Sequence, residues 1–108
     1  MFGPLKTIGH GFRRVGPNHA ATPDFSVSLE DRGRLRYCEG DRAMEIIVDA
    51  TAHPLVVYAF SISQWLSPFA GEIVTPDKKQ EIVARIRLAM RFLDIACDFD
   101  FEYERPVA

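Results

Sequence analysis

The sequence predicts a single α+β domain, in which a mainly antiparallel sheet of about five strands carries one long helix on one face. Two observations lead to this prediction. Between residues 25 and 62, apolar residues recur at alternate positions, as in strands, and turn-forming glycines interrupt the pattern. At Asp94 the apolar period changes from about 3.6 residues, typical of a helix, to about 2, typical of a strand. The expected order of elements is therefore β-β-β-β-α-β.

Four strands are expected before the helix. The first begins at Phe25, where apolar and polar residues alternate, and the second and third cover about residues 35–39 and 44–48. The fourth, over residues 55–62, is apolar at nearly every position, which favours a central strand covered on both faces. Short connections predict that these four strands form an antiparallel meander.

The helix is expected over residues 76–93. Thr75 can cap its first turn, Pro76 suits the first helical position, and Asp77 favours the positive end of the helix dipole. One side carries apolar residues at helical spacing and should cover the sheet: Ile82, Val83, Ile86, Ala89, Met90 and Leu93. A fifth strand should follow over residues 95–104. If it runs parallel to the fourth, the connection between them should be a right-handed crossover.

Residues 1–24 form an N-terminal arm that we expect to be irregular, because it holds four of the seven glycines and three of the seven prolines. The domain proper is then expected over residues 25–108. Leu88 and Phe92 lie off the apolar stripe of the helix. They pack under the N-terminal arm or the Trp65 loop, or they form a contact patch. A homodimer through this patch or through the arm stays open.

Composition narrows the functional classes. A hydrophobic content of 47% and a charged content of 26% are typical of a globular domain. The net charge of −2 argues against general binding of nucleic acids, which normally needs a basic surplus. The two cysteines match no metal spacing and suggest no disulfide framework, which favours a reducing cytoplasm. No stretch approaches membrane-spanning length, so we expect no membrane association.

Near the end of the chain, acids occupy every second position. This acidic row consists of Asp98, Asp100, Glu102 and Glu104. We expect the acidic row to face solvent, with the alternating Phe99 and Phe101 buried beneath the helix, because only the aromatic set can be buried without a large desolvation cost.

Two interpretations of the acidic row stay open. Charges beside an apolar strand protect it from edge-to-edge aggregation, and this is the interpretation we favour for the acids alone. Alternatively, the acidic row binds a basic partner protein, and the loop that carries Trp65 is a second expected contact. Arg32, Arg34 or Arg36 on a neighbouring strand could also pair with these acids. A metal site is not expected, because no nearby motif supplies further oxygen ligands.

No catalytic residue and no cofactor are predicted. Ser61 and Ser63 lack the glycine-flanked turn of a serine hydrolase, and the histidines have no ligand-like spacing. An alternative function is a small enzyme or ligand-binding protein with a site near residues 39–42 and the Trp65 loop. A concave pocket that brings Glu39, Asp41, Arg42 and Ser61 together would favour it.

The segments from Leu35 to Leu93 resemble a family of small bacterial immunity proteins from polymorphic toxin systems, designated immunity protein 74. The residues that carry the resemblance are Tyr37, Glu39, Gly40, Asp41, Arg42, Tyr58, Ser61, Ile62, Trp65, Pro68, Ile82 and Ile86. The resemblance implies a non-enzymatic protein that neutralises a toxin by binding it. Immunity to a nuclease toxin would suit the acidic row, because an acidic surface opposes a basic cleft and speeds association.

Overall fold

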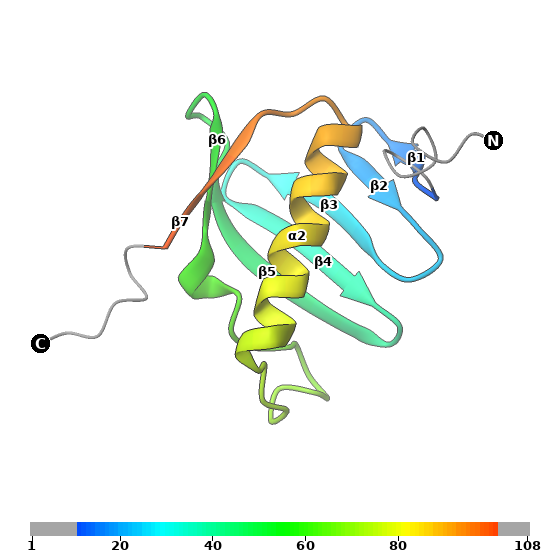
Figure 1. Ribbon diagram of the computed structural model, residues 1–108, viewed down its shortest axis with the longest axis vertical. Helices are drawn as coiled ribbons and strands as arrows, with labels where there is room; N and C mark the ends of the chain where they lie inside the picture. The colour runs from blue at the N-terminus through cyan, green and yellow to red at the C-terminus, as the bar shows by residue number, and fades with distance from the viewer. Residues whose placement is uncertain (1–10, 102–108) are drawn as a thin grey trace, which may run out of the picture.

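The computed structural model describes residues 11–101, which form one α-helix and a seven-stranded mixed sheet (Figure 1). The α+β class is therefore confirmed, although seven strands replace the expected five. The elements are β1 (Arg13–Gly16), β2 (His19–Ala21), β3 (Ser26–Asp31), β4 (Arg34–Glu39), β5 (Arg42–Asp49), β6 (Leu55–Tyr58), the short 3₁₀-helix η1 (Ala59–Ser61), α2 (Pro76–Phe92) and β7 (Cys97–Asp100).

The strands lie side by side in the order of the chain, from β1 to β7. Neighbours from β1 to β6 are antiparallel, so the expected meander of β3 to β6 is confirmed. Strands β6 and β7 are parallel, and α2 lies in the connection between them. The helix crosses one face of the sheet, and the apolar core lies between them (Figure 1).

The two additional strands lie in the N-terminal arm, where we expected irregular chain. Strand β1 pairs with β2 through Arg13 and Ala21, and β2 pairs with β3. Both strands are short, and a β-bulge interrupts their register between Arg14 and Gly16. Segments of three or four residues are too short to show an alternating pattern, so composition dominated the prediction.

The expected strand over residues 55–62 was twice as long as the observed one. Strand β6 ends at Tyr58, and η1 follows. The Ser61 hydroxyl donates a hydrogen bond of 2.7 Å to the Tyr58 carbonyl and accepts one of 2.8 Å from the Ile47 backbone. Ser61 thereby stabilises the turn and accepts a hydrogen bond from the Ile47 N–H of β5, at a position where β6 no longer pairs with β5.

Helix α2 agrees with its sequence signals. The Thr75 hydroxyl accepts a hydrogen bond of 3.1 Å from the Lys78 backbone, and Pro76 begins the helix. All six residues of the predicted apolar stripe are buried. After the last turn, Asp94 adopts a left-handed conformation with φ of 62°. The Ile95 backbone then bonds to the Met90 carbonyl at 2.8 Å, which closes a Schellman motif.

The last strand differs most from expectation. Strand β7 comprises only Cys97–Asp100, and residues 102–108 lie outside the described part of the chain. The burial of both phenylalanines beneath the helix was wrong, because Phe99 is half-buried and Phe101 is 41% exposed. The helix lies across the middle of the sheet, and the end of β7 projects beyond it (Figure 1).

The off-stripe residues of α2 have different surroundings. Phe92 stacks on Phe12 of the N-terminal arm, with ring centroids 5.2 Å apart, as one of the two packing options predicted. Leu88 is 43% exposed.

Candidate partner-binding surface

The face of the sheet opposite α2, called the open face here, is defined by the alternation of the strands. Leu55 and Val57 of β6 are buried in the core, so Val56 and Tyr58 point the other way. The same argument places one side of β3 to β7 on the open face, which includes Ser28, Arg36, Glu45, Ile47, Val56, Tyr58, Asp98 and Asp100.

The first two acids of the acidic row lie on the open face. Asp98 pairs in register with Val56, and Asp100 with Tyr58, and residues paired in this way point to the same side of a sheet. Asp98 is exposed and Asp100 is half-buried. Glu102 and Glu104 lie outside the described residues, so the expectation that these two side chains face solvent stays a prediction.

The arginines of the open face pair with acids on neighbouring strands. Arg34 bonds to Asp31 at 3.0 Å. Arg34 and Arg36 both lie near the Glu45 carboxylate, at 3.6 and 3.7 Å. These side chains are well exposed, so each pair contributes little to stability, on the order of 0.2–1 kcal/mol. Their effect on the open face is to neutralise its centre, several strands away from Asp98 and Asp100.

A hollow of about 480 Å³ lies beside β5, between this strand and the loop of residues 60–70. Its lining includes Glu45, Ile47, Phe60, Ser61, Trp65 and Leu66. Ile47 and Phe60 are 47% and 39% exposed, so both offer apolar surface to a partner at this hollow. The hollow therefore combines apolar walls with polar groups, as binding sites do.

Trp65 lies inside the loop that borders this hollow. Its side chain is only 3% exposed and packs near Tyr37, with ring centroids 6.2 Å apart. The next residue, Leu66, donates a backbone hydrogen bond of 2.8 Å to Ala43 of β5. Trp65 thus anchors the loop from the core side, and the loop residues around it, rather than the indole, face the solvent.

Sequence reasoning missed a polar cluster on the helix side of β4, formed by Tyr37, Glu39, Lys78, Glu81 and Arg85. The Tyr37 hydroxyl and Lys78 donate hydrogen bonds to Glu39 at 2.6 and 2.9 Å. Arg85 contacts Tyr37 at 2.9 Å and Glu39 at 3.3 Å. Glu81 pairs with Lys78 at 2.7 Å and Arg85 at 3.2 Å. The i, i+3 and i+7 spacing on α2 was the signal available in the sequence.

The electrostatics of the polar cluster are those of a stable ionic contact. Partial burial opposes ionisation of Glu39, but the hydrogen bonds from Tyr37 and Lys78 and the nearby positive charges outweigh it, so the pKa of Glu39 lies below its ordinary value. Burial and the Glu39 carboxylate raise the pKa of Tyr37 far above its ordinary value. Both groups therefore keep one protonation state near neutral pH, unlike a general acid or base, whose pKa lies near the working pH.

The residues of the alternative site do not come together. Arg42 forms a bidentate ion pair with Glu72, in which Nε lies 2.7 Å from Oε1 and Nη2 lies 2.6 Å from Oε2. This pair connects the 39–42 turn to the loop before α2. Ser61 lines the hollow, but Glu39, Asp41 and Arg42 do not. Both hydrogen bonds of Ser61 are made to the backbone, so its role here is structural.

Residues 11–101 contain no group of three or more histidine, cysteine or acidic side chains that could hold a metal ion. The same residues include no helix that is both long and apolar enough to cross a membrane.

Comparison with known proteins gives one result. The family model for immunity protein 74 matches residues 26–100, which run from the start of β3 to the end of β7. No curated protein and no solved structure matches the chain. The matched span is wider than the segments that carried the resemblance in the sequence, and it contains α2, the polar cluster and most of the open face. The chain therefore belongs to the immunity protein 74 family.

Proposed function

We propose that this protein neutralises a toxin by binding it, without a catalytic step of its own. Family membership supports the class of function. The residues of the predicted alternative site do not line one common hollow, which also supports the proposal. Arg42 is paired with Glu72, and Ser61 bonds to the backbone of Ile47. A protein that acts by binding needs an available surface instead, and the open face offers one.

The observation that carries the proposal is the combination of a hollow and acidic groups on one sheet face. Ile47 and Phe60 provide apolar anchoring surface at the hollow, and Asp98 provides negative charge near the edge of the same face. Buried apolar anchors dominate the affinity of protein interfaces, whereas charges at the rim mainly set the rate of association. The proposed toxin therefore has a basic contact surface with an apolar side chain that enters the hollow.

The experiment uses the toxin encoded by a gene adjacent to the one for this protein. Expression of the toxin alone should stop bacterial growth, and co-expression of this protein should restore growth. The two proteins should also purify as a complex. A toxin that stays active in the presence of an excess of this protein would overturn the proposal.

Titration of the purified toxin separates binding from catalysis. A binding protein protects in proportion to its amount, with full protection when the two are equimolar. An enzyme would inactivate an excess of toxin, given time. The variant Ile47→Glu, which places a charge at the hollow, should weaken protection without loss of folding, and the matched control is Ile73→Glu, because Ile73 is 86% exposed and lies outside the lining of the hollow.

A further inference from the structure

Strand β7 is the last strand of the sheet, and its outer edge pairs with no strand among residues 11–101. The Leu55 backbone donates a hydrogen bond of 3.0 Å to the Ala96 carbonyl. Because backbone groups of successive residues point to opposite sides of a strand, those of Asp98 also point to β6. The backbone groups of Cys97 and Phe99 therefore point outward, where another strand would bond to them.

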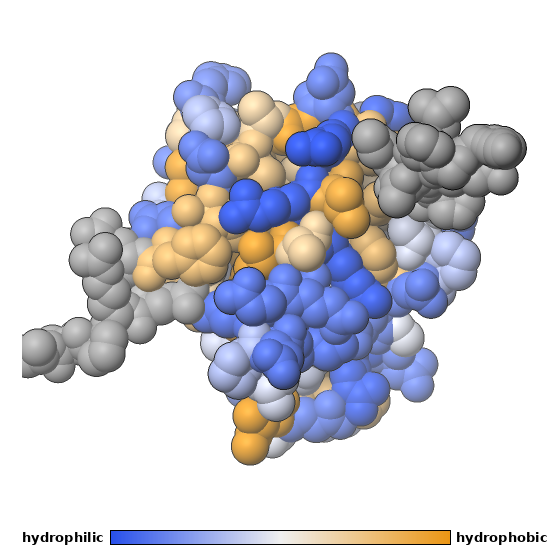
Figure 2. All heavy atoms as spheres, in the orientation of Figure 1, coloured by the Kyte–Doolittle hydropathy of each residue, from blue (hydrophilic) through white to orange (hydrophobic). Residues whose placement is uncertain are grey.

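The two faces of this edge differ in chemistry. On the helix side, Phe99 is half-buried and Phe101 exposed, with ring centroids 6.2 Å apart. Figure 2 shows hydrophobic residues over β7 and the adjoining half of α2, with strongly hydrophilic residues among them. On the open face, Asp98 is exposed and forms no ion pair within the described part of the chain.

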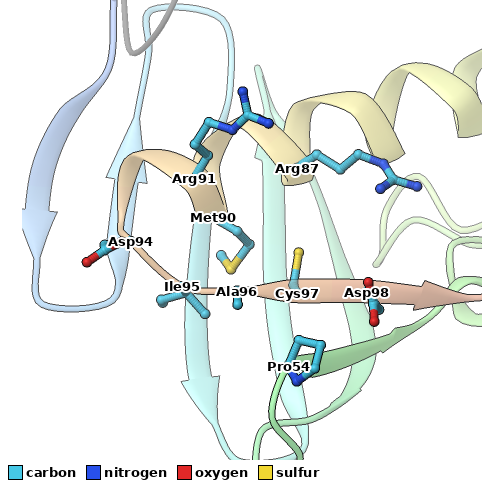
Figure 3. A pocket seen from close by; sticks show the side chains of 9 residues that line it. All are labelled: Pro54, Arg87, Met90, Arg91, Asp94, Ile95, Ala96, Cys97 and Asp98. Carbon is cyan, nitrogen blue, oxygen red and sulfur yellow. The ribbon is translucent and has the colours of Figure 1, made fainter.

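A groove of about 440 Å³ continues the apolar side between β7 and the end of α2 (Figure 3). Met90 and Cys97 point into the space between the helix and the strand, and Arg87 and Arg91 border it from α2. The guanidinium of Arg87 lies over the Phe99 ring, 4.7 Å from its centroid. Side chains of an added strand that point to the helix side would therefore meet a hollow with an apolar floor.

We infer that the outer edge of β7 receives an extended segment of the toxin as an eighth strand, with basic residues on the open face and apolar residues on the helix side. This inference rests on the proposed function and names its mode of contact. Backbone hydrogen bonds from Cys97 and Phe99 would hold the segment, and alternate side chains would give specificity. Asp98 selects a lysine or arginine opposite it, because opposite charges on neighbouring strands attract.

Charge and geometry argue against a second copy of this chain at the same edge. Two β7 strands paired antiparallel about Phe99 would place Asp98 opposite Asp100, and like charges in that position are destabilising. A second copy could instead offer its other edge strand, β1, which carries the basic residues Arg13 and Arg14. The irregular register of β1 between Arg14 and Gly16 disturbs regular pairing with another strand. A basic strand from a different protein satisfies both constraints.

The test uses a blocked pentapeptide that alternates lysine and valine, with backbone amide shifts of the whole protein recorded by NMR. The shifts should saturate, should be largest between residues 97 and 101, and should shrink in high salt. Asp98→Asn should weaken binding about 1.4- to fivefold, the range that corresponds to one cross-strand ion pair. The control Asp24→Asn, an exposed acid beside β3, should bind as the unchanged protein does.

Several results would overturn the inference. The first is a peptide with glutamate in place of lysine that binds equally well, and the second is a set of shifts centred on another surface. The third is the absence of any shift at millimolar peptide. The fourth is self-association of the protein through β7 without peptide. A peptide whose valine amides are N-methylated, which removes backbone donors, should lose affinity. If the adjacent toxin is neutralised while the peptide fails to bind, the edge inference falls and the proposed function stands. If the peptide binds but this protein does not bind the toxin, the edge of β7 accepts a basic strand, whereas the proposed function and the toxin as the source of that strand are both contradicted.

Discussion

The hydroxyl of Tyr37 donates a hydrogen bond of 2.6 Å to the carboxylate of Glu39, two residues later on the same side of β4. Lys78 and Arg85 reach the same carboxylate from α2. Tyr37 is fully buried and the Glu39 side chain is 19% exposed, so these hydrogen bonds are largely shielded from solvent. They hold the first half of α2 to β4. Hydrogen bonds to charged groups in such surroundings contribute more than those at the surface.

Glu39→Gln should lower the free energy of unfolding by about 1–3 kcal/mol, because it leaves two cations and a buried hydroxyl without their shared carboxylate. The measurement is urea denaturation at neutral pH. Glu72→Gln is the matched control, because it breaks the well-exposed pair with Arg42 and should cost only about 0.2–1 kcal/mol. An equal or smaller loss for Glu39→Gln would contradict the role assigned to the polar cluster.

The pH dependence of this loss follows from the lowered pKa of Glu39. Its contribution is complete above the pKa of the unfolded chain, about 4.3, and is lost as the pH falls through the lower pKa of the folded state. The difference in unfolding free energy between the unchanged protein and Glu39→Gln should therefore narrow below about pH 4.3. A difference that stays constant on acidification would show that the carboxylate charge is not involved.

Tyr37 should resist ionisation until the protein unfolds. Burial and the nearby Glu39 raise its pKa, whereas the unfolded chain ionises at about pH 10. The stability from this group is thus complete below that pH and is lost as the pH rises further. In a spectrophotometric titration, one tyrosine should ionise only together with unfolding. Tyr37→Phe should remove this late component; its persistence would assign it to another tyrosine.

Asp94→Gly should raise the free energy of unfolding by about 0.4–1 kcal/mol. Asp94 has φ of 62°, a conformation that glycine adopts without strain, and its charge lies at the negative end of the helix dipole. Asp94→Ala is the control, because it removes the same charge but keeps a Cβ atom at positive φ. Thermal unfolding that ranks the alanine variant above the glycine variant would contradict this explanation.

Phe92 and Leu88 should respond differently to truncation. Phe92→Ala removes the stacking on Phe12 and should cost about 1–3 kcal/mol, below the range for a fully buried phenylalanine. Leu88→Ser should change stability by less than about 0.5 kcal/mol, as exposed positions do. Sedimentation of the two variants also tests the homodimer that the sequence left open: a lower mass for Leu88→Ser alone would identify Leu88 as a dimer contact.

The parts of the fold that the sequence predicted well are those with a long, regular period. The helix stripe from Ile82 to Leu93 and the alternation around Tyr37 and Met44 span enough residues for burial to impose a pattern. Strands β1 and β2 were missed because they are too short for such a pattern.

The candidate site was harder to predict, because it depends on contacts between distant segments. Alternation alone predicted that the acidic row faces solvent, and of its four acids the structure describes Asp98 and Asp100, both on the open face. By contrast, the burial of Trp65 depends on how its loop folds back onto Tyr37, and the hollow depends on η1, which ends the apolar run at Tyr58. Neither event has a local signal. The exposure of Phe101 likewise depends on where α2 crosses the sheet.

The rate at which the protein associates with the toxin of its adjacent gene tests the central claim most directly. At low salt, the double change Asp98→Asn and Asp100→Asn should slow association about three- to tenfold, and high salt should shrink the difference. The double change Asp24→Asn and Asp41→Asn removes equal charge from exposed positions away from β7 and should have little effect. An association rate unchanged by the first pair at low salt would contradict the account and leave the acidic row with a strand-protecting role.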